Sequence, residues 1–214
     1  MSNRSRAREL CADALKDGRP TAWFETLYLE ADLGEASVPW DDRQPNPHLM
    51  YWLSGNSVSG RALDVGCGYG DNTGALLKAG MDVTAFDVSS TAVAQARASN
   101  PKASFEVVEA PALPADWHHA FNLVVEIYTL QTLPASLQED VAASVARCVA
   151  PGGQLLIIAR GRDDDEPHRS MPWPISRADL ANFNLDGLEV TEFRDFLDDE
   201  EPAVRRFVVT LERA

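Results

Sequence analysis

Three alternating glycines, Gly66, Gly68 and Gly70, follow a short apolar segment over 61–65 and precede an amphipathic segment that begins at Asn72. An apolar run of this length is typical of a buried parallel strand. A strand, a glycine-rich turn and a helix together form the nucleotide-binding corner of a doubly wound sheet. A residue without a Cβ lets a ligand lie against the backbone. The spacing is G-x-G-x-G, whereas dinucleotide sites have G-x-G-x-x-G. We therefore expect a nucleotide-type ligand other than a dinucleotide.

Four carboxylates stand in or at the ends of the expected strands: Asp64, Asp87, Glu109 and Glu126. Asp87 ends the second strand, where a carboxylate accepts both hydroxyls of a ribose. Asp64 lies inside an apolar strand, so it must be paired there and would order the glycine turn or one end of the ligand. Glu109 is either a ligand contact or a solvated side chain. Glu126 either contacts an ammonium group or forms part of a substrate wall.

A regular alternation of strands and helices positions these residues. We predict strands near 61–65, 82–87, 104–108, 121–126 and 153–159, with helices near 71–79, 89–99 and 135–149 between them. Segments 188–196 and 204–211 alternate like strands, and the short link between them suits an antiparallel hairpin. This order predicts a three-layer α/β sandwich around a mostly parallel seven-stranded sheet.

Several helix starts have a sequence signature. Asn46 before Pro47 predicts a helix over 48–54, and Ser89 is expected to cap the helix that follows it. Ser136 with Glu139 predicts a capping box. Ser176, with Asp179 three residues later, predicts a helix that runs to Phe183. Helices expected over 5–16 and 22–31 lie before the sheet. We predict a helical cap or lid over 1–55 and the sheet domain over 56–214.

Composition narrows the class of protein. The net charge of −14 excludes the basic surface that nucleic-acid binding needs. We expect no membrane segment, because no apolar run reaches about 20 residues. Three cysteines without metal-ligand spacing predict a reduced, cytoplasmic setting and no metal. The four histidines are interpreted as surface or capping residues, and Cys67 as a packed residue.

The stretch Leu63 to Gly70 (L-D-V-G-C-G-Y-G), the segment that ends at Asp87 and Pro151-Gly152-Gly153 resemble the motifs of class I S-adenosylmethionine-dependent methyltransferases. The resemblance runs from about Arg61 to Ala214. It implies S-adenosylmethionine as the methyl donor, with its ribose on Asp87 and its adenine near Glu109 and Ala110.

Two further segments resemble one branch of that class, the thiopurine, thiol/halide and tellurite-resistance methyltransferases. Val38 to Asp41 (V-P-W-D), with prolines after it, is similar to a segment of the thiol/halide enzymes, and Met171 to Ile175 is similar to a substrate loop of the thiopurine enzymes. The resemblance implies that Trp40 covers the cofactor and that Trp173 covers the substrate.

Two sets of candidate site residues follow. The cofactor set comprises Trp40, Asp64, Gly66, Cys67, Gly68, Gly70, Asn72, Asp87, Val88, Glu109, Ala110, Glu126 and Ile127. The substrate-pocket set comprises Trp23, Tyr28, Tyr128, Gln131, Arg160 and Trp173. Tyr128 and Gln131 could equally serve in packing.

We expect S-methylation of a small thiol by a monomer or homodimer. A thiol is partly ionised near neutral pH, and no residue in the sequence stands out as a strong base. The alternatives are an O- or N-methyltransferase of a small metabolite, a nicotinamide-dependent oxidoreductase on the same sheet, and a non-catalytic S-adenosylmethionine-binding protein.

Overall fold

The structure is a computed structural model that describes residues 3–167, 171–184 and 187–214. Within this part of the chain, seven strands form one sheet in the order β3-β2-β1-β4-β5-β7-β6. The strands are β1 (Arg61–Val65), β2 (Asp82–Asp87), β3 (Ser104–Val107), β4 (Phe121–Ile127), β5 (Val149–Arg160), β6 (Leu188–Leu197) and β7 (Arg205–Arg213). The first five are parallel, and β7 pairs antiparallel with both β5 and β6. The predicted sheet with its C-terminal hairpin is confirmed.

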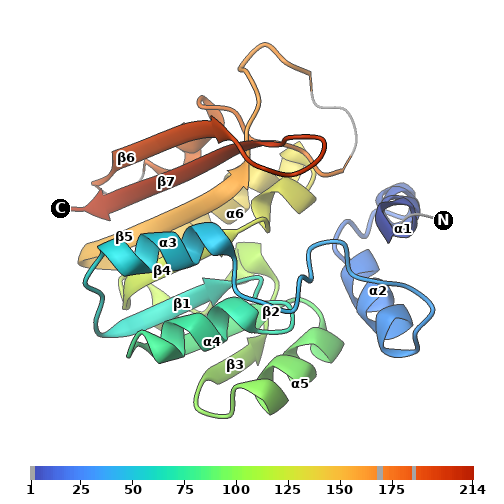
Figure 1. Cartoon of the computed structure of the whole chain (residues 1–214), viewed down its shortest axis with the longest axis horizontal. Helices are drawn as coiled ribbons and strands as arrows, with labels where there is room; N and C mark the ends of the chain where they lie inside the picture. Colours follow the sequence, from blue (N-terminus) through green and yellow to red (C-terminus); the bar gives the residue numbers. More distant parts are fainter. Residues whose placement is uncertain (1–2, 168–170, 185–186) are drawn as a thin grey trace.

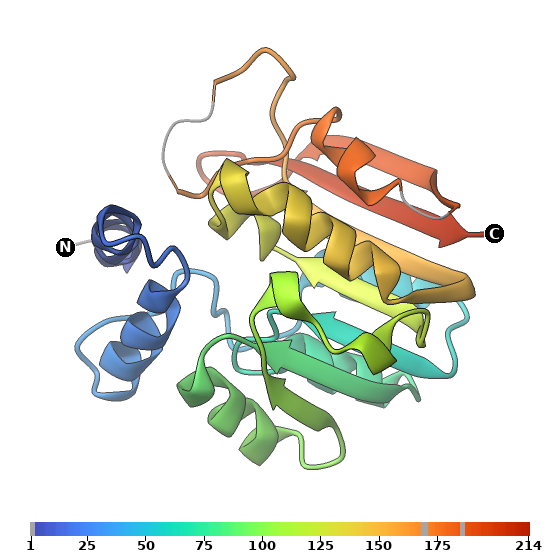
Figure 2. The same ribbon diagram turned by 180° about the vertical axis from the view of Figure 1, so that it is seen from behind.

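Helices cover both faces of the sheet (Figures 1 and 2). On one face lie α3 (Pro47–Gly55), α4 (Asp71–Lys78) and α5 (Ser90–Ser99), and on the other lies α6 (Ala135–Arg147). The short 3-10 segments are η1 (Ala110–Ala112), η2 (Ala115–Trp117), η3 (Leu130–Thr132) and η4 (Asp179–Phe183). No helix in the described part of the chain is long and apolar enough to cross a membrane.

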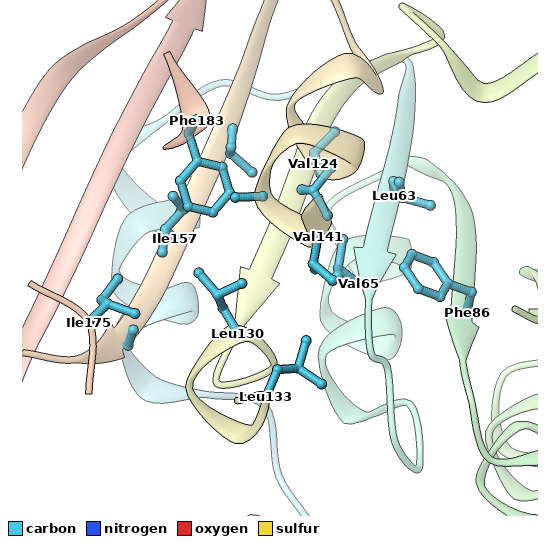
Figure 3. Packing of buried hydrophobic residues seen from close by; sticks show 14 of the residues in the cluster. Leu63, Val65, Phe86, Val124, Leu130, Leu133, Val141, Ile157, Ile175 and Phe183 are labelled. Carbon is cyan, nitrogen blue, oxygen red and sulfur yellow. The ribbon is translucent and has the colours of Figure 1, made fainter. Parts of the chain in front are cut away.

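The α6 side of the sheet holds the larger core cluster (Figure 3). Leu63, Val124 and Ile157 come from three adjacent parallel strands, and Val141 of α6 packs on them. Leu130, immediately after β4, belongs to the same cluster. The loop after β4 is therefore fixed by apolar packing directly beside the carboxyl ends of the strands.

Helices α1 (Asn3–Lys16) and α2 (Ala22–Asp32) lie beyond the carboxyl ends of the parallel strands (Figures 1 and 2). Glu25 of α2 attaches them to the first turn of α5. Its carboxylate accepts hydrogen bonds from Ser89 Oγ at 2.6 Å and Thr91 Oγ1 at 2.8 Å, with others from Ser90 Oγ and Thr91 N. A carboxylate at a helix N-terminus is also stabilised by the helix dipole.

Helix α3 belongs to the sheet layer rather than to the cap. Leu49 and Trp52 are buried against Leu123 and Leu156, and Trp52 Nε1 donates to Thr210 Oγ1 of β7 at 3.0 Å. The boundary between the segment that packs as a cap and the segment that packs on the sheet therefore falls before Pro47, whereas we predicted a cap over 1–55. The sequence pattern does not reveal this difference, because an apolar helix face fits a lid as well as a sheet.

Most predicted helix starts agree with the structure. Asn46 Oδ1 accepts from His48 N at 2.9 Å, and Ser89 Oγ accepts from Ala92 N at 3.1 Å, so both caps are confirmed. The capping box at Ser136 was wrong: α6 begins at Ala135 after Pro134, with no side-chain cap. The segment after Ser176 forms only the five-residue η4.

Candidate cofactor and acceptor site

The site lies at the carboxyl ends of β1 and β4, where the order of the strands across the sheet changes direction. From β1 the chain continues to β2 on one side, whereas β4 lies on the other side of β1 and leads to β5. Loops that leave two such neighbouring strands diverge, and this opens a crevice at their carboxyl ends. The glycine turn follows β1, and Tyr128 and Thr129 follow β4. The two loops that the sequence singled out therefore face one another.

The glycine turn leaves no room for side chains. Gly66 and Gly68 have φ of 62° and 53°, a region that L-residues adopt only with strain. A Cβ on Gly66 would stand 2.3 Å from Thr129 Oγ1, and one on Gly68 would stand 2.9 Å from the Tyr28 hydroxyl. Gly70 has a different role, because a Cβ there would meet Asn100 and Ala96 of the α5 segment. Gly66 and Gly68 face the crevice, and Gly70 lets α5 pack closely against the glycine turn.

Asp87 holds the glycine turn in place. Its Oδ2 accepts from Gly68 N at 3.0 Å, and its Oδ1 accepts from Ser89 N at 2.9 Å. Burial raises the pKa of Asp87, while these two backbone hydrogen bonds act to lower it. A carboxylate has about four acceptor positions, so each oxygen still has a lone pair for a ligand hydroxyl.

Asp64 lies beneath the turn instead of lining the crevice. Its Oδ2 accepts from Thr73 Oγ1 of α4 at 2.6 Å. Burial raises the pKa of Asp64 to about 7, and the nearby charge of Asp87 acts in the same direction. Asp64 is therefore paired, as we predicted for a carboxylate inside an apolar strand, and its partner is the helix that follows the glycine turn.

Three cavities meet around Trp40 and Tyr128, which line all of them. We call the first, of about 760 Å³, the acceptor cavity. A narrower cavity, the nucleoside cavity, extends from Asp87 past Glu109 to apolar side chains of α6. Another, the turn cavity, runs along Gly66, Cys67 and Gly68 to Asn72. The Trp40 indole N–H donates to the Tyr28 hydroxyl at 3.1 Å and so closes the wall between the turn and the cap.

Tyr128 has a strained backbone at the junction of these cavities. Its φ is 64°, which is uncommon for a residue other than glycine and costs of the order of 1–3 kcal/mol. Burial raises the pKa of its phenol, and Arg206 acts to lower it. The Arg206 guanidinium lies 4.9 Å from the centre of the Tyr128 ring. The surrounding packing therefore holds a protonated phenol between the cofactor side and the acceptor side.

The acceptor cavity is bounded by the cap, α3 and the β6–β7 hairpin. Its ionisable lining residues are Arg8, Asp42, His48, Tyr128, Arg160, Asp198, Asp199, Glu200 and Arg206. Arg206 forms ion pairs with Asp198, at 2.6 Å, and with Glu200. Its charge is therefore balanced by its own hairpin. The cavity combines an aromatic wall at Trp40 and Phe196 with a histidine, which suits a compact neutral molecule.

Residues 62–153 match the model of a family described as a methyltransferase domain. The matched segment covers less than half of the chain. This match supports the predicted class of methyltransferases. The match spans β1 through β4 and the start of β5, so it includes the glycine turn but not the β6–β7 hairpin.

The names of curated relatives of this chain describe methyltransferases of different substrates. A 2-heptyl-1-hydroxyquinolin-4(1H)-one methyltransferase of Mycobacteroides abscessus is 23% identical over 68% of this chain and 66% of its own length. A ubiquinone biosynthesis O-methyltransferase of Aromatoleum aromaticum is 31% identical over 55% of this chain and 52% of its own length. Thiocyanate methyltransferase 1 of Arabidopsis thaliana is 26% identical over 58% of this chain and 57% of its own length. The chain thus spans about half to two thirds of the length of these relatives.

Solved structures share the fold across most of the chain. A protein from work on the conversion of a disulfide bond into a thioacetal group during echinomycin biosynthesis has a TM-score of 0.72 and 22% identity. The match covers 89% of this chain and 93% of that one. TehB from Haemophilus influenzae has a TM-score of 0.67 and 17% identity, and the match covers 87% of this chain and 67% of that one. At this identity the likeness concerns the fold alone.

The structure brings most of the predicted residues together. Those that line a cavity are Tyr28, Trp40, Gly66, Cys67, Gly68, Asn72, Asp87, Val88, Glu109, Ala110, Ile127, Tyr128, Gln131 and Arg160. Cys67 is buried, and burial raises the pKa of its thiol, which fits a packed residue rather than a nucleophile.

Other predicted residues lie behind the site. Trp23 stacks on Phe24, with ring centres 4.0 Å apart, and supports Trp40 from behind. The Trp173 amide donates to Gln131 O at 2.6 Å, while its neighbours Met171 and Pro172 line the acceptor cavity. Glu126 lines none of the three cavities. Its Oε1 accepts from Leu130 N at 2.8 Å and fixes the loop after β4.

Sequence reasoning missed much of the acceptor cavity, including His48, Phe196 and Arg206. His48 was interpreted as a surface or capping residue, and Phe196 and Arg206 were treated only as parts of strands. The sequence signal for His48 was its position after Asn46-Pro47, at a helix start close to Trp40. The hairpin residues gave no such signal, because alternation along a strand does not show what its end covers.

Proposed function

We propose that this chain transfers a methyl group from S-adenosylmethionine to a small molecule bound in the acceptor cavity. The observation that carries the proposal is that Trp40 and Tyr128 line all three cavities. A nucleoside at Asp87 and an acceptor beside His48 would meet at these two side chains. A nicotinamide-dependent oxidoreductase is disfavoured by the spacing of the glycine turn and by the methyltransferase domain match.

The residues of the narrower cavities suit S-adenosylmethionine. Asp87 has free lone pairs for the ribose hydroxyls, and Val108, Ala110 and Leu133 offer apolar surface to the adenine. The turn cavity carries Asp41, Asp42 and Asp71, whose negative charge complements a cationic ligand. When bound, S-adenosylmethionine supplies a methyl group on a positively charged sulfur.

The chain's own contribution is alignment and exclusion of water. Since the donor is already activated, holding the acceptor atom in line with the methyl group provides most of the acceleration. Trp40 and Tyr28 close the glycine turn from the cap side, and Tyr128 fixes the border between donor and acceptor. None of these steps needs a metal or a covalent intermediate on the protein.

Two acceptor atoms suit the cavity. A thiol fits the aromatic wall of Trp40 and Phe196 and needs little help in ionising, which supports the S-methylation expected from the sequence. A hydroxyl needs a base, and His48 lines the same cavity. The curated relatives include both an O-methyltransferase and a thiocyanate methyltransferase.

Cofactor binding is tested by calorimetry with S-adenosylmethionine on the wild type, Asp87→Ala and Asp82→Ala. Asp87→Ala should weaken binding by more than tenfold, because it removes two charge-assisted hydrogen bonds to the ribose. Each such bond is worth roughly 1.5–3 kcal/mol. Asp82 is an exposed residue at the other end of β2, so its substitution is the matched control. A loss smaller than tenfold in Asp87→Ala places the ribose elsewhere.

The acceptor class is tested with matched aromatic and alkyl thiols, phenols and amines, by the release of S-adenosylhomocysteine. Turnover of any member supports a small-molecule methyltransferase over a non-catalytic binding protein. A phenol or amine methylated a hundredfold faster than every thiol would exclude S-methylation as the main activity.

A further inference from the structure

His48 occupies a special place in the acceptor cavity. It follows Asn46, the N-cap, and Pro47, so its ring stands at the start of α3 and reaches the cavity that Tyr128 and Arg206 also line. The ring lies edge-to-face on Phe196 of β6, with 5.3 Å between ring centres. This contact between α3 and the hairpin fixes the orientation of the imidazole.

Burial and the nearby arginines favour a neutral His48 ring. Burial lowers the pKa of His48, and Arg206 of β7 and Arg194 of β6 act in the same direction. Asp198 and Glu200 in the hairpin turn oppose this, but both are paired with Arg206. Asp42 lies on the same cavity wall. The positive end of the α3 dipole further disfavours protonation. His48 is therefore unprotonated, and able to accept a proton, at pH 7.

Other ionisable groups of the cavity are not suited to this role. The Tyr128 phenol has a raised pKa and remains a donor. Asp198 already accepts hydrogen bonds from Arg206 Nε, Val204 N and Glu200 N. Arg8, Arg160 and Arg206 cannot accept a proton. The other carboxylates of the cavity are Asp42, Asp199 and Glu200. A carboxylate is a weaker base than an imidazole, so among the described lining residues His48 has the chemistry best matched to a general base near neutral pH.

We propose that His48 is the general base of the acceptor cavity and that the acceptor atom it serves is a hydroxyl oxygen of a small molecule. The inference rests on the proposed methyltransferase function. A hydroxyl, unlike a thiol, is almost fully protonated at pH 7, so a positioned base accelerates its methylation by about 10²–10⁴-fold. The hydroxyl oxygen forms a bond to the methyl carbon, and the bond from sulfur to that carbon breaks with its electron pair staying on sulfur. The proton passes to a ring nitrogen of His48 and then to solvent.

The test compares His48→Phe with the wild type and with His118→Asn. Phe keeps the volume and the ring contact with Phe196, and His118 is an exposed histidine far along the chain. With a phenol at pH 7, His48→Phe should lower kcat by a hundredfold or more and change KM less than threefold. With an aromatic thiol, which is largely ionised at pH 7, kcat should stay within threefold of the wild type. His118→Asn should match the wild type throughout.

Two further readouts separate a base from a packing residue. In the wild type, kcat/KM for the phenol should rise to a plateau through a pKa below 6.5, whereas in His48→Phe it should follow ionisation of the phenol itself. In NMR titrations of the free protein, the His48 imidazole should titrate below 6.5. Calorimetry should give S-adenosylmethionine affinities within twofold for the wild type and His48→Phe.

Failure at each level is distinguishable. If the wild type binds no S-adenosylmethionine, the proposed function is wrong and the role of His48 is wrong with it. If the wild type binds S-adenosylmethionine but methylates only thiols, or if His48→Phe keeps its kcat for phenols, the proposed function stands and His48 is not the base.

Discussion

At the scale of single residues, Glu126 is a buried carboxyl group that supports the site without touching it. It is 1% exposed, its Oε1 accepts from Leu130 N, and its Oε2 has no hydrogen-bond partner among the described residues. Burial raises its pKa to about 7 from the usual 4.5. Because the folded state then binds the proton more tightly than the unfolded state, stability is greatest below pH 4.5 and is lost as the pH rises to about 7.

We therefore expect the difference in unfolding free energy between Glu126→Gln and the wild type to depend on pH. Gln keeps an acceptor for Leu130 N and does not ionise. From pH 4.5 to 8 the variant should gain up to about 3 kcal/mol relative to the wild type, since one pKa unit corresponds to about 1.4 kcal/mol. Urea unfolding across this range measures the difference, with the exposed Glu189→Gln as the control. A constant difference would contradict the burial of an ionisable Glu126.

At the scale of elements, the attachment of α2 to α5 decides whether the cap closes the site. Glu25 accepts four hydrogen bonds from the start of α5, whereas Glu30 of the same helix pairs with Arg6 of α1, with Nε to Oε2 at 2.8 Å. Partial burial acts to raise the pKa of Glu25, but hydrogen bonds from Ser89, Thr91 and Ser90 leave it below the usual value. The attachment is thus fully charged at neutral pH.

Glu25→Ala should release α2 from the sheet, while Glu30→Ala should loosen only α1 from α2. Amide hydrogen exchange in α2 should rise at least tenfold in Glu25→Ala and remain near the wild-type rate in Glu30→Ala. Exchange in β1 and β4 should be unchanged in both variants. Equal exchange of α2 in the two variants would show that Glu25 is not the main attachment.

At the scale of the whole molecule, the cap completes cavities that the sheet begins. Phe24 and Tyr28 of α2 line the nucleoside cavity, and Ala7 and Arg8 of α1 line the acceptor cavity. The cluster between the sheet and α3 and α4 contains no cap residue, whereas the cluster on the α6 side also includes Trp23, Phe24 and Leu27 of α2.

Removal of residues 1–32 should leave a folded sheet and abolish turnover. Circular dichroism and a cooperative unfolding transition would report the fold, and release of S-adenosylhomocysteine from an acceptor that the full chain methylates would report turnover. A truncated protein that folds and turns over at the full rate would show that the cap does not close the site.

The sequence by itself predicted the succession of strands and helices along the chain, the hairpin and the glycine turn. These features depend on local patterns, namely apolar runs, Gly66 and Gly68 at a strand end, and Asn46 or Ser89 at a helix start. Such patterns act over a few residues, so they can be interpreted without knowing what lies opposite. The same reasoning failed at Ser136, because α6 already begins at Ala135, directly after Pro134.

Only the tertiary structure decided which side chains share a cavity. His48 and Phe196 are far apart in the sequence and meet because α3 packs on the sheet through Trp52 and Thr210. Trp173 and Trp23 were predicted to line the substrate pocket, yet neither is among the residues that line the three cavities. Each segment could bury more than one of its faces, and packing between distant elements decides which face is buried. The neighbours of a side chain, and therefore its chemistry, depend on that packing.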